Sequence, residues 1–65
     1  MATYRWYIIG TRRDSETVQI LGWSRDRIAA LGRPGVIAVY YASSRRMAAR
    51  LAKADRGFEI KWRKY

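Results

Sequence analysis

Residues 36–42 read VIAVYYA and lead directly into residues 43–55, SSRRMAARLAKAD, and these two segments decide the fold. The first segment is apolar on both faces of an extended chain, which is typical of a strand that is central in its sheet or covered on both sides. In the second segment, Ser43 or Ser44 can cap a helix over about residues 44–55. Helical spacing predicts the buried stripe of this helix, made of Met47, Ala48, Leu51 and Ala54.

Two strands are predicted ahead of this unit. Residues 3–12, TYRWYIIGTR, are rich in aromatic and β-branched side chains, and residues 17–23, TVQILGW, alternate between apolar and polar. The polar residues 13–16 between them predict a turn, so the two strands are expected to form an antiparallel hairpin.

Residues 24–32 allow two interpretations. Ser24 as the N-cap and Gly32 after the last turn, with Pro34 beyond it, predict a short helix. The alternative continues the strand and turns the chain at residues 33–35, whose Arg-Pro-Gly order suits a type II turn. We favour the short helix.

The segment after the main helix predicts a last strand. Gly57 is free to take a positive φ and end the helix. Apolar side chains then alternate with charged ones, namely Phe58, Ile60 and Trp62 with Glu59, Lys61 and Arg63. The expected fold is a small α+β domain, with a three- to four-stranded antiparallel sheet and one main helix on one face, in the order β-β-(short helical turn)-β-α-β.

The bulk composition excludes several classes of protein. A chain of 65 residues predicts a single compact basic domain, and the absence of cysteine and histidine excludes disulfides and a structural zinc site. Residues 62–65 spell WRKY, but the plant DNA-binding domain of that name needs Cys and His zinc ligands. No apolar run approaches the ~20 residues that cross a bilayer, and the residues after Met1 lack the apolar h-region expected of a signal peptide. We expect an intracellular, cytoplasmic protein without a metal or cofactor.

Catalysis is not expected, because histidine and cysteine are the commonest general bases and nucleophiles. Residues 59–61, Glu-Ile-Lys, have the form of a nuclease strand, but Asp55 is the partner acid available and no third ligand is evident. Phosphate-binding glycine motifs are also absent from the sequence.

The charge of the chain predicts a polyanionic partner or an acidic protein surface. Fourteen Lys and Arg oppose five Asp and Glu, a net charge of +9, and residues 42–65 carry +6 of it. Such a charge repels itself, and a polyanion would relieve that repulsion on binding. The alternative is a surface that serves only solubility.

The start of the main helix is the leading candidate for an anion site. Arg45 and Arg46 stand in the first turn, where the helix dipole is positive and each cation costs ~0.3–1 kcal/mol. Together with free N–H groups and the hydroxyls of Ser43 and Ser44, they describe an anion site. The alternative is that these arginines are exposed, screened and unbound. A stripe of cations continues along the helix through Arg46, Arg50 and Lys53.

Aromatic side chains are expected on the sheet face that the main helix leaves open. Alternation puts Tyr4, Trp6 and Ile8 on one face of the first strand, and Arg5, Tyr7 and Ile9 on the other. One helix covers one face, so the second face is expected to expose tyrosines among Arg5, Lys61 and Arg63. Such a face suits stacked bases, a protein interface or homodimer, or a second small core under residues 28–31. Charge favours nucleic acid among these.

Two resemblances point to phage proteins. Residues 42–62, a helix followed by GFEIKW, are similar to the helix-to-last-strand half of a family of small phage inhibitors of RNA polymerase, which this chain also resembles in length and element order. A three-stranded sheet with a helix is also similar to the arm-binding domains of phage integrases. The resemblances imply a small viral or mobile-element protein.

The sequence therefore predicts a small non-catalytic basic protein that binds DNA or RNA, mainly through phosphates, and is of phage or mobile-element origin. The alternative is a phage-type inhibitor or adaptor that docks on an acidic surface of a host protein, such as transcription or defence machinery; a ribosomal or virion subunit is a third. The predicted anion-binding residues are Ser43, Ser44, Arg45, Arg46, Arg50, Lys53, Arg12, Arg13, Lys61, Arg63 and Lys64. The predicted stacking or interface residues are Tyr7, Tyr41 and Tyr65.

Overall fold

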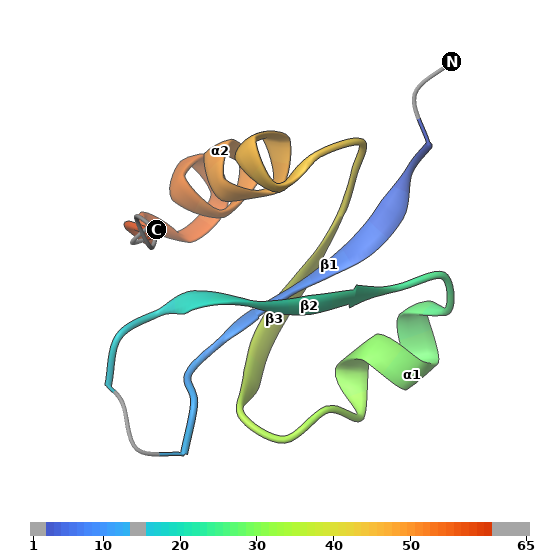
Figure 1. Ribbon diagram of the computed structural model, residues 1–65. Helices are drawn as coiled ribbons and strands as arrows, with labels where there is room; N and C mark the ends of the chain where they lie inside the picture. Colours follow the sequence, from blue (N-terminus) through green and yellow to red (C-terminus); the bar gives the residue numbers. More distant parts are fainter. Residues whose placement is uncertain (1–2, 14–15, 61–65) are drawn as a thin grey trace, which may run out of the picture.

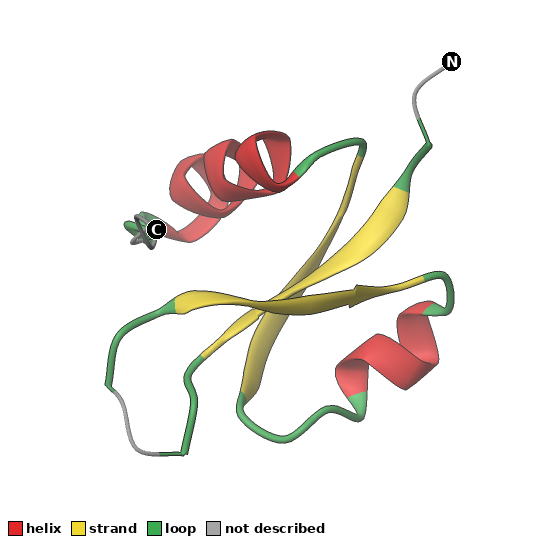
Figure 2. Ribbon diagram, viewed as in Figure 1, coloured by secondary structure: helices red, strands yellow, loops and turns green. Residues whose placement is uncertain are grey.

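The computed structural model describes residues 3–13 and 16–60, which form three strands and two helices in the order β-β-α-β-α (Figures 1 and 2). The elements are β1 (Arg5–Gly10), β2 (Gln19–Ser24), α1 (Arg27–Leu31), β3 (Val36–Ala42) and α2 (Arg45–Arg56). The strands pair antiparallel in the order β2-β1-β3, and α2 is the main helix. The predicted small α+β fold is confirmed.

β1 is the central strand of the sheet. Tyr7 pairs with Trp23 of β2 on one side and with Tyr40 of β3 on the other, and Ile8 and Ile9 are fully buried. β3 is therefore an edge strand, so of the two explanations that its apolar sequence allows, a central position does not apply. Its apolar character has the other cause that such a pattern allows, since helices pack on both of its faces.

The two helices lie on opposite faces of the sheet (Figure 1). α2 covers the face of Tyr7, where Tyr7, Ala42 and Ala48 form a buried cluster flanked by the half-buried Ile20, Met47 and Leu51. α1 covers part of the opposite face, where Ile8 and Ala30 are fully buried. A second small core therefore exists, and Ala30 is the residue of α1 buried in it. Ile28 is 78% exposed, because a helix of five residues turns few side chains toward the sheet.

Local signals set both ends of α2. The hydroxyl of Ser44 accepts a hydrogen bond from the backbone N–H of Met47 at 3.1 Å, which makes Ser44 the N-cap. Gly57 ends the helix at φ 73°, and its N–H donates to the carbonyl of Lys53. The buried stripe runs through Met47, Ala48, Leu51 and Ala52. Ala54 was predicted in it but is exposed, because it lies off the axis of that stripe.

Both interpretations of the segment before β3 are partly right. The short helix exists, but its N-cap is Asp26, whose carboxylate accepts from the N–H of Ile28, and not Ser24. Ser24 ends β2, and its hydroxyl accepts from the N–H of Asp26. The turn also exists: Gly35 has φ 81° after Pro34, and the N–H of residue 36 donates to the carbonyl of residue 33, as in a type II turn.

The predicted last strand is wrong over the part that the structure describes. Residues 57–60 form no strand, and residues 61–65 lie outside the described part of the chain. Phe58 and Ile60 are half-buried and line a groove beside α2, so their alternation reflects packing against the helix. Neither helix in residues 3–13 and 16–60 has the length and apolar character needed to cross a membrane.

Candidate nucleic-acid interface

The outer face of α2 carries three cations into one groove. Arg46, Arg50 and Lys53 lie on the side of the helix opposite the buried stripe and line an open groove of about 350 Å³. Ala49 lies between them, and Phe58, Glu59 and Ile60 form the opposite wall, so one carboxylate faces the three cations. This groove, called the helix groove below, brings together three of the predicted anion-binding residues.

The start of α2 is polar, but its two serines already have partners. Ser44 caps the helix, and the hydroxyl of Ser43 donates to the sulfur of Met47 at 3.4 Å. Arg45 and Arg46 are exposed, and the first turn contains no acidic side chain. The arginines are therefore the groups at this helix start that are available to an anion.

A second basic hollow lies at the other end of the sheet, where β1 ends and β3 begins. It has a volume of about 960 Å³ and is lined by Arg12, Arg13 and Arg33, with Leu21 and Pro34 as apolar walls. This hollow, called the turn hollow below, unites two predicted residues with Arg33, which was not predicted. No carboxylate lines it among the described residues.

A close backbone contact between the end of β1 and the turn at residues 33–36 brings Arg33 to the turn hollow. The N–H of Thr11 donates to the carbonyl of Gly35 at 3.1 Å, and a Cβ added to Gly10 would lie 2.1 Å from the same carbonyl oxygen. Glycine at position 10 thus lets the turn at residues 33–36 dock on the end of β1. The Arg33-Pro-Gly order was a visible signal for the turn, but the partner of that turn was not visible.

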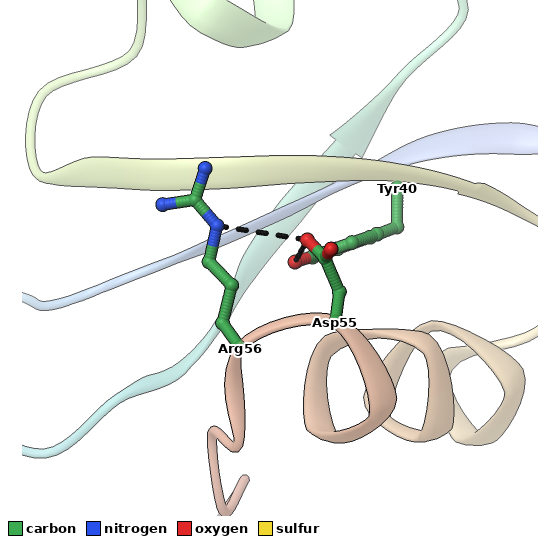
Figure 3. Close-up of polar contacts among 3 residues, drawn as sticks. All are labelled: Tyr40, Asp55 and Arg56. Atoms are coloured by element: carbon green, nitrogen blue, oxygen red, sulfur yellow. Dashed lines mark hydrogen bonds and ion pairs between the residues drawn. The ribbon is translucent and has the colours of Figure 1, made fainter.

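The acidic side chains neutralise little of the positive charge. Asp55 accepts a hydrogen bond from the hydroxyl of Tyr40 at 2.8 Å and lies 3.6 Å from Nε of Arg56 (Figure 3). Burial, and then the hydrogen bond from Tyr40 to Asp55, raise the pKa of the Tyr40 hydroxyl above its usual 10.0. Asp26 caps α1. Within residues 3–13 and 16–60, the Arg56–Asp55 contact is the one ion pair, so the cations of both basic surfaces lack a carboxylate partner there.

Of the exposed aromatic residues, Tyr4 and Tyr41 lie on the face opposite α2, whereas Trp23 lies on the face of Tyr7. Tyr41 is 51% exposed and Tyr4 45% exposed, and Trp6 lies with them: the Tyr41 ring centroid is 4.9 Å from that of Trp6 and 5.3 Å from that of Tyr4. We call these three residues the aromatic platform. The guanidinium of Arg27 lies 5.7 Å from the ring centroid of Trp6. Tyr4 and Trp6 were expected to share a face but were not predicted as site residues.

The face expected to remain open is in fact the covered one. Tyr7 is 5% exposed and belongs to the core under α2, so its ring is not available to stack on a ligand. Arg5 shares this face, with its guanidinium 4.0 Å from the ring centroid of Trp23. Aromatic residues occupy both faces of β1 and β3, and the sequence does not say which face the helix takes. Four predicted residues, Lys61, Arg63, Lys64 and Tyr65, lie outside the described residues.

The fold and these surfaces define a small basic α+β domain with two cationic hollows and an exposed aromatic platform. Comparison with protein-family models found no match, and comparisons with curated proteins and with solved structures found none either. No group of three or more potential metal-ligating side chains occurs in the described part of the chain.

Proposed function

We propose that this protein is a non-catalytic nucleic-acid-binding protein that holds its ligand mainly through phosphates. The observation that carries the proposal is the grouping of cations that have no ion-pair partner among the described residues: three line the helix groove, beside the carboxylate of Glu59, and three line the turn hollow. When Lys and Arg side chains contact the phosphates of a nucleic acid, they displace the counterions condensed on its backbone, and the release of these counterions drives binding.

The chemistry of the side chains favours backbone contact over base reading. The chain has no asparagine, and its one glutamine, Gln19, accepts a hydrogen bond from Nε of Arg12 at 3.2 Å. Amide side chains are the usual bidentate readers of adenine, so little sequence selectivity is expected. Arginine is also the residue that best matches phosphate geometry, because its planar guanidinium donates two parallel hydrogen bonds.

Charge-matched variants test the proposal. Arg46→Gln with Arg50→Gln removes two positive charges from the helix groove, and Arg25→Gln with Arg56→Gln removes two exposed charges outside both hollows. Fluorescence anisotropy with a labelled oligonucleotide at low salt measures the affinity of each double variant. We expect the first pair to weaken binding at least fivefold more than the second. Equal losses would show that only net charge matters, and absence of binding by the wild-type protein would refute the proposal.

A further inference from the structure

We infer that the aromatic platform stacks unpaired bases, which makes the ligand single-stranded rather than duplex nucleic acid. This inference rests on the proposed function, because the phosphate contacts supply most of the affinity and the platform selects the strand type. The observation behind it is a cluster of three rings of which two, Tyr4 and Tyr41, are about half exposed.

The platform is built to present its rings to a ligand. Trp6 comes from β1 and is half-buried, so it supports Tyr41 from the neighbouring strand at 4.9 Å. α1 buries Ile8 and Ala30 further along the same face, but it leaves Tyr4 and Tyr41 open. Each base has a π-face that can stack on such a ring, whatever its sequence.

Charge beside the platform favours a nucleic acid as the occupant. Arg27 lies over Trp6 at 5.7 Å, and its guanidinium has no carboxylate partner within residues 3–13 and 16–60. Aromatic rings interleaved with unneutralised cations are the usual surface for single strands.

The platform also lies near the junction between the end of β3 and the start of α2. Tyr41 is followed by Ala42, which pairs with Arg5 at the start of β1, and then by the exposed Arg45 and Arg46. Figure 1 shows the start of β1, the end of β3 and the start of α2 at one corner of the molecule. Arg45 and Arg46 follow Tyr41 by four and five residues, so we expect them to contact phosphates next to a base that stacks on the platform.

The bases of a duplex cannot stack on the aromatic platform without leaving the duplex. Its bases are stacked on one another and paired, so exposing them to Tyr4 and Tyr41 would cost the unstacking energy. A single strand presents its bases at no such cost. The platform should therefore separate the two ligands, while the basic hollows attract both.

The test compares two oligonucleotides of the same phosphate charge, each on the order of 12 nucleotides, a length typical of small single-strand sites. One is oligothymidine and the other consists of abasic sites. We expect the wild-type protein to bind oligothymidine about tenfold or more tightly at fixed salt. The double variant Tyr4→Thr with Tyr41→Thr keeps strand-forming residues but removes both rings, and the difference should disappear.

Controls distinguish the outcomes. Tyr4→Phe with Tyr41→Phe keeps the rings and should keep the preference, and Ile37→Thr removes an exposed side chain from the same strand without touching the platform. Equal wild-type affinity for the two oligonucleotides would overturn the inference and leave the proposed function intact. So would a platform variant that changes the oligomeric state in sedimentation but not the preference. Binding to neither oligonucleotide at low salt would instead refute the proposed function.

Discussion

The hydroxyl of Tyr40 donates a hydrogen bond of 2.8 Å to Oδ2 of Asp55, and this contact ties the last turn of α2 to the edge strand β3 (Figure 3). It matters because the core under α2 is small: Ala48 and Ala52 are its fully buried helical side chains. The outer face of the same helix carries the helix groove. A contact that fixes α2 therefore also fixes three of the proposed phosphate ligands.

Removing this hydroxyl should loosen the helix. Tyr40→Phe keeps the ring and loses the hydrogen bond, so we expect the free energy of unfolding to fall by about 0.5–1 kcal/mol, the usual net value for an accessible hydrogen bond. Urea denaturation followed by circular dichroism measures it. Asp55→Ala should give a similar loss, and the double variant little more than either single one. Fully additive losses would show that the two side chains act independently.

The same contact makes stability depend on alkaline pH. The folded state raises the pKa of Tyr40 above its ordinary 10.0, first through burial and then through Asp55. The stabilisation is therefore complete below about pH 10 and is lost as the pH rises through the folded-state pKa. We expect the wild-type protein to lose more stability than Tyr40→Phe as the pH rises above about 10. Parallel stability curves for the two proteins over this range would contradict this.

Two glycines should respond in opposite ways to alanine. A Cβ at Gly10 would lie 2.1 Å from the carbonyl oxygen of Gly35, so Gly10→Ala must displace the turn that carries Arg33. We expect a loss of about 1–3 kcal/mol, as for other overpacked sites. Gly32 has φ −83°, and a Cβ added to it would lie 3.6 Å from its nearest atom, the carbonyl oxygen of Ala29. Gly32→Ala should therefore be neutral or stabilising. Thermal unfolding of both variants would show it, and equal melting temperatures would refute the close approach.

A cation in the first turn of α2 should lower the stability of the protein but strengthen its binding to an oligonucleotide. Arg45→Glu places an acid at the positive end of the helix dipole and should stabilise the protein by about 0.3–1 kcal/mol. It should also weaken oligonucleotide binding. Arg56→Glu makes the same charge change at the other end of the helix, where a cation is favourable, and should destabilise. If both variants shift stability in the same direction, net charge rather than the dipole is responsible.

The sequence predicted three strands, both helices and the β1–β2 hairpin, but it did not predict the sheet order, and its last strand is absent from the described residues. β3 was expected at residues 36–42 and lies there, and the Ser44 and Gly57 signals marked the ends of α2, because strand composition and caps are local properties. The alternation at residues 58–60 was misread, since the same period-two pattern arises where a coil packs two apolar side chains against a helix.

The site was predicted in part for the same reason. The stripe of Arg46, Arg50 and Lys53 follows from helical spacing alone, so it could be read directly. Arg33 joins Arg12 and Arg13 only through a tertiary contact between a turn and the end of β1. The choice of Tyr7 as a stacking residue failed because both sheet faces are aromatic, and only the position of α2 decides which one is buried.

The salt dependence of oligonucleotide affinity tests the central claim most directly. If the six cations of the helix groove and the turn hollow contact phosphates, the slope of log K against log salt concentration should be about −4 for a single strand. Arg46→Gln with Arg50→Gln should reduce that slope by roughly one to one and a half. A flat line for the wild-type protein, or no binding at low salt, would contradict the account.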